Sequence, residues 1–145
     1  MTTAIDNAIS KRLADRGVRY TSGRRQVVTT LVTADGPLSA HELATVLGSD
    51  LPLSTIYRTL AVLSEADVLT PHLATKGLAR YELAEWLTGH HHHLVCIECG
   101  GVEDVEVAPK QEAAVEQLVA AIAETAGFTA TNHALEIEGR CARCT

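Results

Sequence analysis

Apolar side chains recur every three or four positions through the first 67 residues, a spacing that places them on one face of an α-helix. The pattern predicts four helices, at residues 5–16, from Thr21 to a break at 35–37, at 39–47 and at 54–67. Ser39 and Glu42 have the spacing of a capping box, which marks the start of the third helix.

Beyond residue 67 the pattern predicts two short strands, at residues 68–74 and 79–84, joined by a turn at Lys76-Gly77. Short helices followed by a two-stranded hairpin are typical of a winged helix-turn-helix. In such a domain the second helix of the pair, here residues 54–67, enters the major groove of DNA.

The N-terminal part of that helix carries four candidate DNA contacts, Ser54, Thr55, Tyr57 and Arg58. The alternatives are a packing role for Tyr57 and a solvated charge for Arg58. The net charge of −6 argues against a general nucleic-acid binder, but it is unevenly distributed. Residues 1–83 carry nine Lys and Arg against eight Asp and Glu, whereas residues 84–145 carry three against ten. A DNA-binding role is therefore expected for the first half only.

Four consecutive histidines, His90 to His93, begin the second half and lead into an apolar segment that is predicted to be a strand. Side chains alternate between the faces of a strand, so His91 and His93 point one way and His90 and His92 the other. Each pair of imidazoles suits zinc, iron or nickel. A solvent-exposed polar strand is the alternative.

The rest of this half is predicted to contain a strand at 101–107, an amphipathic helix at 110–126 and a strand at 131–139. Four apolar side chains of the helix are expected to face inward: Val115, Leu118, Val119 and Ile122. A unit of roughly 60 residues buries little surface alone, so we expect it to dimerise through a free sheet edge.

The four cysteines form two C-x-x-C pairs, Cys96 with Cys99 and Cys141 with Cys144. In a reducing compartment, where disulfides are disfavoured, paired cysteines of this spacing hold a tetrahedral zinc. The sequence therefore predicts a structural Zn²⁺ that joins the histidine strand to the C-terminal end. A redox pair and unrelated free thiols are the alternatives.

A chain of 145 residues suffices for one domain or two small ones. No apolar run reaches the roughly 18 residues of a membrane span, and the N-terminus lacks a signal-like apolar core, so a cytoplasmic protein without membrane contact is expected. We expect an α+β fold. It consists of a winged helix-turn-helix domain (1–83), a hinge (84–89) and a small α/β dimerisation domain with a four-cysteine zinc site (90–145).

Several separated motifs, in order, resemble the ferric uptake regulator (Fur) family of bacterial metal-sensing transcription factors: LSTIYRTLAVLSEADVL, YEL, HHHHLVCIECG and NHALEIEGRCARC. The resemblance extends from Thr21 to Cys144. It implies a homodimer that, when loaded with metal, binds an inverted-repeat operator in double-stranded DNA. Such proteins usually repress genes of metal uptake or stress.

The resemblance also implies roles for individual residues. The implied DNA contacts are Arg24, Tyr57 and Arg58. The implied structural zinc ligands are Cys96, Cys99, Cys141 and Cys144. The implied regulatory metal site at the hinge consists of Glu82, His91 and His93. The implied metal site inside the dimerisation domain consists of His90, His92, Glu116 and His133.

Two departures from the family pattern leave the sensed metal open. Iron- and peroxide-sensing members commonly have a histidine just before the third helix, where this chain has Pro37. Zinc-sensing members often have a cysteine before the histidines, where this chain has Ala84 or Trp86, and an acid or histidine at the place of Thr70. His72, two residues further along the same strand face, is expected to substitute as a hinge ligand; an exposed wing histidine is the alternative.

The missing histidine and the four-histidine run favour Zn²⁺ over Fe²⁺ or Mn²⁺ as the regulatory metal. Glu82 and the lack of a spare cysteine favour iron, manganese or peroxide sensing instead. We therefore expect a zinc-responsive repressor of metal homeostasis genes, with the other metals as the alternative.

Two other classes compete with a metal-sensing repressor. A zinc-dependent enzyme needs an open metal position and a general base, but the sequence has no H-E-x-x-H motif and no recognisable Ser/His/Asp arrangement. We expect no catalytic residues and no enzyme. A zinc-stapled module that binds DNA without sensing would differ in having a metal-independent operator affinity.

Overall fold

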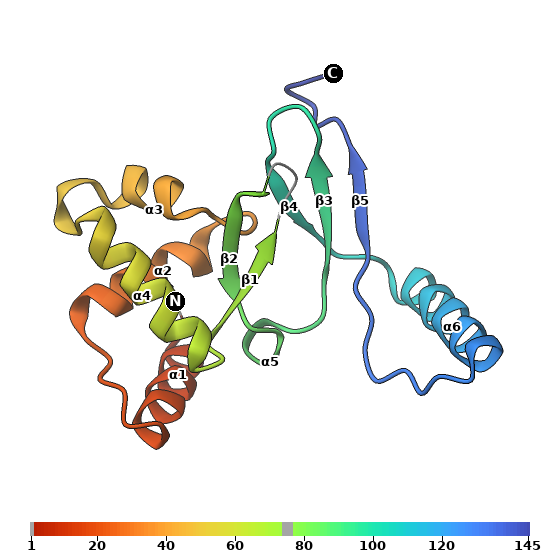
Figure 1. Cartoon of the computed structure of the whole chain (residues 1–145), viewed down its shortest axis with the longest axis horizontal. Coiled ribbons are helices and arrows are strands. Elements are labelled where there is room, and N and C mark those ends of the chain that lie inside the picture. Colours follow the sequence, from red (N-terminus) through yellow and green to blue (C-terminus); the bar gives the residue numbers. More distant parts are fainter. Residues whose placement is uncertain (1, 74–76) are drawn as a thin grey trace.

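The structure, a computed structural model, describes residues 2–73 and 77–145. Figure 1 shows two parts, the N-terminal helices with a small hairpin on one side and a second sheet with a long helix on the other. The elements in chain order are α1 (Thr3–Asp15), α2 (Ser22–Thr33), α3 (Ala40–Leu47), a 3-10 turn (Gly48–Asp50), α4 (Leu53–Glu65), β1 (Leu69–Leu73), β2 (Ala79–Leu83), α5 (Glu85–Thr88), β3 (His92–Cys96), β4 (Val102–Val105), α6 (Pro109–Ala126) and β5 (Glu136–Gly139). The turn predicted at Lys76 and the strand end predicted at Ala74 lie outside the described residues.

The four predicted N-terminal helices are confirmed, and their apolar faces share one core. The predicted capping box at Ser39 and Glu42 is present at the start of α3, while the Thr21 hydroxyl accepts a hydrogen bond at the start of α2. The fully buried apolar side chains of this core are Ile9, Leu13, Val27, Val28, Leu43, Ile56, Leu60, Leu63 and, just after α4, Val68. Burial of these side chains is the main favourable term that holds the four helices together.

The hairpin of β1 and β2 packs beside α2 and α4 as the predicted wing. The strands are antiparallel, with Thr70 opposite Glu82 and His72 opposite Arg80. The backbone of Tyr81 also exchanges two hydrogen bonds with Leu38, which precedes α3. Since Arg80 donates to Glu42 of α3 over 2.6 Å, the wing is fixed directly to the helix-turn-helix.

The second part is built on a three-stranded sheet of order β4-β3-β5, in which β4 is antiparallel and β5 parallel to β3. Its buried apolar core is small and consists of Val95 and Val102. Only Glu136–Gly139 of the strand predicted at 131–139 forms a strand. The residues before it approach β3 through one backbone hydrogen bond, from His93 to Leu135.

The long helix α6 differs from the prediction in its burial. Its apolar side chains were expected to face inward, but Leu118 and Ile122 are each 60% exposed, and Val115 and Val119 are only half-buried. In Figure 1, α6 lies beyond β5, away from the N-terminal helices. Because one chain offers nothing to cover this apolar face, the expectation of inward packing is wrong for the single chain.

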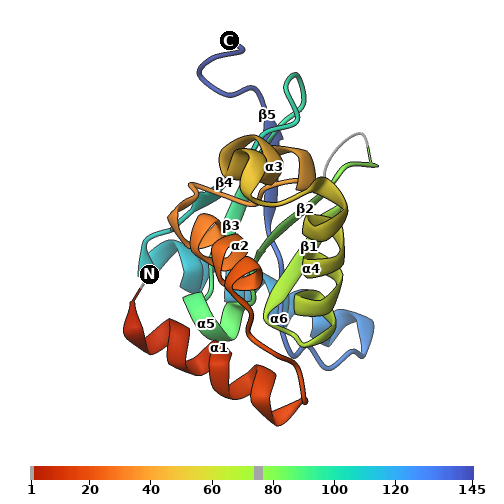
Figure 2. The same ribbon diagram turned by 90° about the vertical axis from the view of Figure 1, so that its left-hand side faces the viewer.

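The two parts meet where the connection between α2 and α3 approaches β4. The backbone N–H of Asp104 donates to the carbonyl of Asp35 over 3.1 Å. A Cβ atom on Gly36 would lie 2.3 Å from the Val102 carbonyl oxygen, so only glycine fits there without a shift. Viewed from the helical side, α1 to α4 lie in front of the strands and α6 lies behind (Figure 2). Within the described residues, no helix is long and apolar enough to span a membrane.

Candidate metal centres and DNA-binding helix

The predicted separation of the four histidines into two pairs is confirmed, although β3 begins only at His92, so that His90 and His91 precede the strand. His91 and His93 point into one group of possible metal ligands, and His90 and His92 point into another. We call the first group the wing cluster; its members are Glu82, His91, His93 and Asp104. We call the second group the helix cluster; its members are His90, His92, Glu112 and His133. Within each group, the ligand atoms all lie within 4.8 Å of one another.

The wing cluster joins the two parts of the molecule. Glu82 belongs to β2 of the wing, while His93 on β3 and Asp104 on β4 are register partners in the second sheet. The Nε2 atoms of His91 and His93 lie 3.0 and 3.1 Å from Glu82 Oε2. Asp104 Oδ1 lies 3.4 Å from Nε2 of His93. A cation bound among these atoms would bridge the wing and the second sheet.

Sequence reasoning missed Asp104 and placed His72 in the same site. The structure brings His72 to the edge of the wing cluster, with Nε2 2.6 Å from Glu82 Oε1 and its ring 4.4 Å from that of His93. His72 is not among the four residues whose ligand atoms all converge. The alternating strand around Asp104 was visible in the sequence, but only the register of β4 against β3 brings its carboxylate to His93.

The charges in the wing cluster favour cation binding. Burial raises the pKa of Glu82, but hydrogen bonds from His72, His93 and His91 outweigh it and hold that pKa well below its ordinary value. Burial and the nearby Glu82 charge raise the pKa of Asp104. A metal ion would replace the imidazole protons as the positive partner of both carboxylates.

The orientation of His91 also suits a metal ligand. Its Nδ1 atom lies 3.1 Å from the carbonyl oxygen of Gly89, which accepts the ring proton. Nε2 donates to Glu82 in this structure, and once that proton is lost, with the other kept on Nδ1, the lone pair of Nε2 is free to bind metal. Such hydrogen bonds from the far ring nitrogen are typical of metal-binding histidines.

The helix cluster is compact, and it corrects one prediction. Glu112 contacts Nε2 of His92, His133 and His90 at 2.6, 2.8 and 3.0 Å. The sequence-based choice of Glu116 is wrong, because Glu112 lies one helical turn earlier on α6 and is the carboxylate that reaches the histidines. Hydrogen bonds from His92 and His133 outweigh burial and lower the pKa of Glu112.

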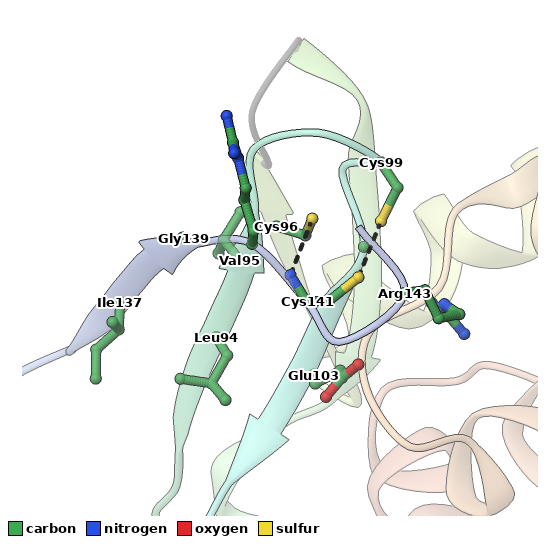
Figure 3. Close-up of a pocket in the computed structure, with 11 residues that line it drawn as sticks. Leu94, Val95, Cys96, Cys99, Glu103, Ile137, Gly139, Cys141 and Arg143 are labelled. Carbon is green, nitrogen blue, oxygen red and sulfur yellow. Dashed lines mark hydrogen bonds between the residues drawn. The ribbon is translucent and has the colours of Figure 1, made fainter. Parts of the chain in front are cut away.

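The four cysteines come together as predicted, all as free thiols with their sulfur atoms mutually within 4.8 Å. Figure 3 shows Cys96 and Cys99 facing Cys141, with Cys99 Sγ 3.9 Å from Cys141 Sγ. Backbone N–H groups of Cys99 and Cys141 point at Cys96 Sγ and lower the pKa of that thiol to about 6. Stabilised thiolates in a tetrahedral set are the ligands that zinc prefers.

The predicted DNA contacts lie on the helix-turn-helix. On α4, Tyr57 is 48% exposed, Arg58 and Ser54 are exposed, and Thr55 is half-buried. Within the described chain, Arg58 has no hydrogen bond or ion pair. Arg24 lies in the first turn of α2 and donates to the carbonyl of Arg19 over 2.6 Å, so part of its guanidinium is already engaged.

Comparisons with known proteins agree with this arrangement. The sequence profile of the ferric uptake regulator family matches residues 15–138. The ferric uptake regulation protein of Legionella pneumophila is 36% identical, over 93% of this chain and 97% of its own. The crystal structure of the Vibrio cholerae ferric uptake regulator superposes with a TM-score of 0.73 at 30% identity, covering 91% of this chain and 98% of the other. A zinc-bound manganese uptake regulator superposes with a TM-score of 0.69 at 28% identity, covering 92% of this chain and 98% of the other.

A winged helix with an exposed recognition helix, joined by a ligand cluster to a second, cysteine-bearing domain, defines a DNA-binding protein that responds to metal. The chain belongs to the ferric uptake regulator family. It therefore has an N-terminal DNA-binding domain and a C-terminal dimerisation domain, and it is a metal-responsive transcription regulator, not an enzyme.

Proposed function

We propose that the protein is a homodimeric repressor of metal homeostasis genes, and that the wing cluster is its regulatory metal site. The observation that carries this proposal is that the cluster draws Glu82 from the wing and its other ligands from the second sheet. A metal there fixes the DNA-binding domain, and with it Tyr57 and Arg58, relative to the dimerisation domain. Residues 84–89 then act as the hinge between the domains at 1–83 and 90–145.

Metal occupancy controls operator affinity if the metal binds the fixed arrangement better than an open one. A coupling of roughly 1–3 kcal/mol between the two sites changes operator affinity about 5- to 150-fold. Two copies related by a two-fold axis present two α4 helices, which explains an inverted-repeat operator. An operator-binding regulator acts where the genes are, which for a bacterial regulator is the cytoplasm.

The donor set of the wing cluster favours Fe²⁺ or Mn²⁺ as the regulatory metal. It offers two carboxylates and two imidazoles, and His72 lies close enough to Glu82 to add a third imidazole. Oxygen-rich nitrogen and oxygen sites with more than four donors suit iron and manganese, whereas zinc prefers four-coordinate sites and often thiolates. Asp104, which the sequence did not reveal as a ligand, shifts the balance away from the zinc response expected earlier.

Zinc remains the second candidate for the regulatory site. The affinity order of divalent metals places zinc above iron and manganese at a given nitrogen and oxygen site. A similar structure is that of a zinc-bound manganese uptake regulator. A protein of this fold can therefore bind zinc even when its name assigns it to another metal. Availability in the cell then decides which metal regulates.

The other two clusters suit zinc rather than iron or manganese. The cysteine cluster supplies four sulfur ligands, and the helix cluster supplies three imidazoles and one carboxylate, each a four-coordinate set. The most exposed apolar side chains of the second domain are then covered by a second copy: Leu118, Ile122, Phe128 and Ile137. Large apolar side chains left exposed in one domain mark a candidate protein interface.

The test is operator binding by protein stripped of weakly held metal and then titrated anaerobically with Fe²⁺, Mn²⁺ or Zn²⁺. We expect Fe²⁺ and Mn²⁺ to restore operator affinity in the wild type but not in a His91→Ala, His93→Ala variant, which keeps its dimer and its cysteine zinc. A response to Zn²⁺ alone would favour the second candidate. Equal operator affinity with and without every metal would contradict the proposal.

A matched pair of variants tests the helix cluster. Glu112→Ala should remove one metal ion per chain, whereas Glu116→Ala, one turn further along α6, should keep it. Metal content per chain, measured after gel filtration, distinguishes the two. Loss of the metal from Glu116→Ala instead would show that Glu116, and not Glu112, is the carboxylate ligand of the helix cluster.

A further inference from the structure

We propose that Glu85 is a positioning residue that couples metal in the helix cluster to the DNA-binding domain through helix α5. The inference rests on the proposed metal site at the helix cluster. It adds a second route of regulation, independent of the wing cluster. Glu85 itself is not one of the clustered ligands.

The first link is the contact between Glu85 and His90. A Glu85 carboxylate oxygen accepts a hydrogen bond from Nδ1 of His90. On the other side of the same ring, Nε2 lies 3.0 Å from Glu112 and 3.2 Å from Nε2 of His133. The carboxylate therefore holds the ring proton on Nδ1 and aims the Nε2 lone pair into the cluster. A partner of this kind fixes the tautomer and strengthens the ligand.

The second link is geometric, because this contact spans the boundary between the domains. Gly89 lies between Glu85 and His90 and has a φ of +87°, a conformation that favours glycine. A flexible residue at this point would let the two domains rotate against each other. The Glu85–His90 hydrogen bond closes a loop around Gly89 and restricts that rotation.

The third link joins α5 to the DNA-binding domain through Trp86. The indole Nε1 donates to the carbonyl of Asp67, which follows α4, over 2.7 Å. The Arg12 guanidinium of α1 stacks over the indole ring at 4.0 Å and also donates to the Asp67 carboxylate over 3.1 Å. Neighbouring residues of α5 thus contact the helix cluster on one side and two DNA-binding-domain segments on the other.

Helix α5 is held to the DNA-binding domain by Leu87, which packs against the N-terminal core, and by the contacts of Trp86, whereas Glu85 alone, among the described residues, ties it to the helix cluster. The helix has only four residues and no side-chain cap at its start. A helix of this length is not stable by itself, so its position depends on tertiary contacts. Metal that immobilises His90 will therefore immobilise Glu85, and with it Trp86 against Arg12 and Asp67.

Trp86 provides the measurement, because it is the only tryptophan of the chain. The experiment uses the full-length His91→Ala, His93→Ala protein, in which the wing cluster no longer binds metal. Zn²⁺ is added while zinc content, Trp86 anisotropy and quenching of Trp86 by acrylamide are followed. Glu85→Ala and Glu85→Gln are compared in this background, with Glu116→Ala as the matched carboxylate control.

We expect zinc in the helix cluster to raise Trp86 anisotropy and lower its quenching in the background protein and in the Glu116→Ala control. In Glu85→Ala, zinc should still bind, with an affinity about 10- to 100-fold lower, and Trp86 should not respond to it. Glu85→Gln keeps an acceptor for Nδ1 and should recover part of the Trp86 response.

Two results would overturn the proposal in different ways. If zinc fills the helix cluster and Trp86 responds equally with and without Glu85, the coupling through Glu85 is wrong while the metal site stands. If the background protein holds only the zinc of the cysteine cluster at every zinc concentration, the helix cluster is not a metal site and both proposals fail there.

Discussion

Substitution of Gly36 tests whether the contact between the two domains controls DNA binding. In Gly36→Ala the new Cβ would lie 2.3 Å from the Val102 carbonyl oxygen and 3.0 Å from the Glu103 Cα atom. Both are backbone atoms of β4 and cannot rotate away. The connection between α2 and α3 must move away until the Cβ atom is more than 3.0 Å from the Val102 carbonyl oxygen. This movement strains the 3.1 Å hydrogen bond from Asp104 to Asp35.

The cost can be worked out from these two effects. Overpacking of a rigid contact costs about 1–3 kcal/mol, and a lost backbone hydrogen bond about 1 kcal/mol. After partial relaxation of the loop, the arrangement in which residues 35–36 contact β4 should be about 2 kcal/mol less stable than in the wild type. This corresponds to roughly a 30-fold weaker operator affinity at a given metal concentration. Because the docked loop also supports Asp104 of the wing cluster, the metal affinity should fall with it.

The assay is fluorescence anisotropy of a labelled operator at saturating metal, together with thermal unfolding. Gly139→Ala is the matched control, since a Cβ atom there meets nothing within 4 Å and its backbone needs no positive φ. We expect the control to bind as the wild type does. An unchanged affinity in Gly36→Ala would refute the reasoning, and a higher affinity would mean that the docked arrangement is the one that does not bind DNA.

Three further predictions concern the other sites. Cys96→Ser should unfold the C-terminal half and release zinc, because structural zinc supplies on the order of 10 kcal/mol of folding energy; a folded, dimeric variant in gel filtration and circular dichroism would contradict this. Arg58→Ala should weaken operator binding by about 1–3 kcal/mol if the guanidinium reads a base, while Lys110→Ala on α6 should not, as gel-shift titrations at low and high salt would reveal. Metal affinity of the wing cluster should fall as the pH drops from about 8 to about 6, because the hydrogen bond to Glu82 raises the pKa of His72, and a ligand must lose its proton before it binds metal; a pH-independent metal Kd would show that no such proton is displaced.

Local patterns in the sequence were sufficient for much of the fold. The capping box at Ser39 and Glu42 and the helical spacing of apolar residues identify α1 to α4, because helices are defined by contacts three or four residues apart. Strand alternation likewise separated His91 and His93 from His90 and His92, since the two faces of a strand follow from residue parity alone. The C-x-x-C spacing identified the cysteine cluster for the same local reason.

Contacts between distant segments were decided only by the tertiary structure. The choice of Glu112 over Glu116 depends on how α6 is rotated against the sheet, and both residues fit the sequence pattern equally well. Asp104 became a ligand candidate only through the register of β4 against β3, which short-range patterns do not fix. The exposed face of α6 is a further example. Amphipathic spacing indicates that one face is apolar, but it does not indicate whether the chain itself or a second copy covers that face.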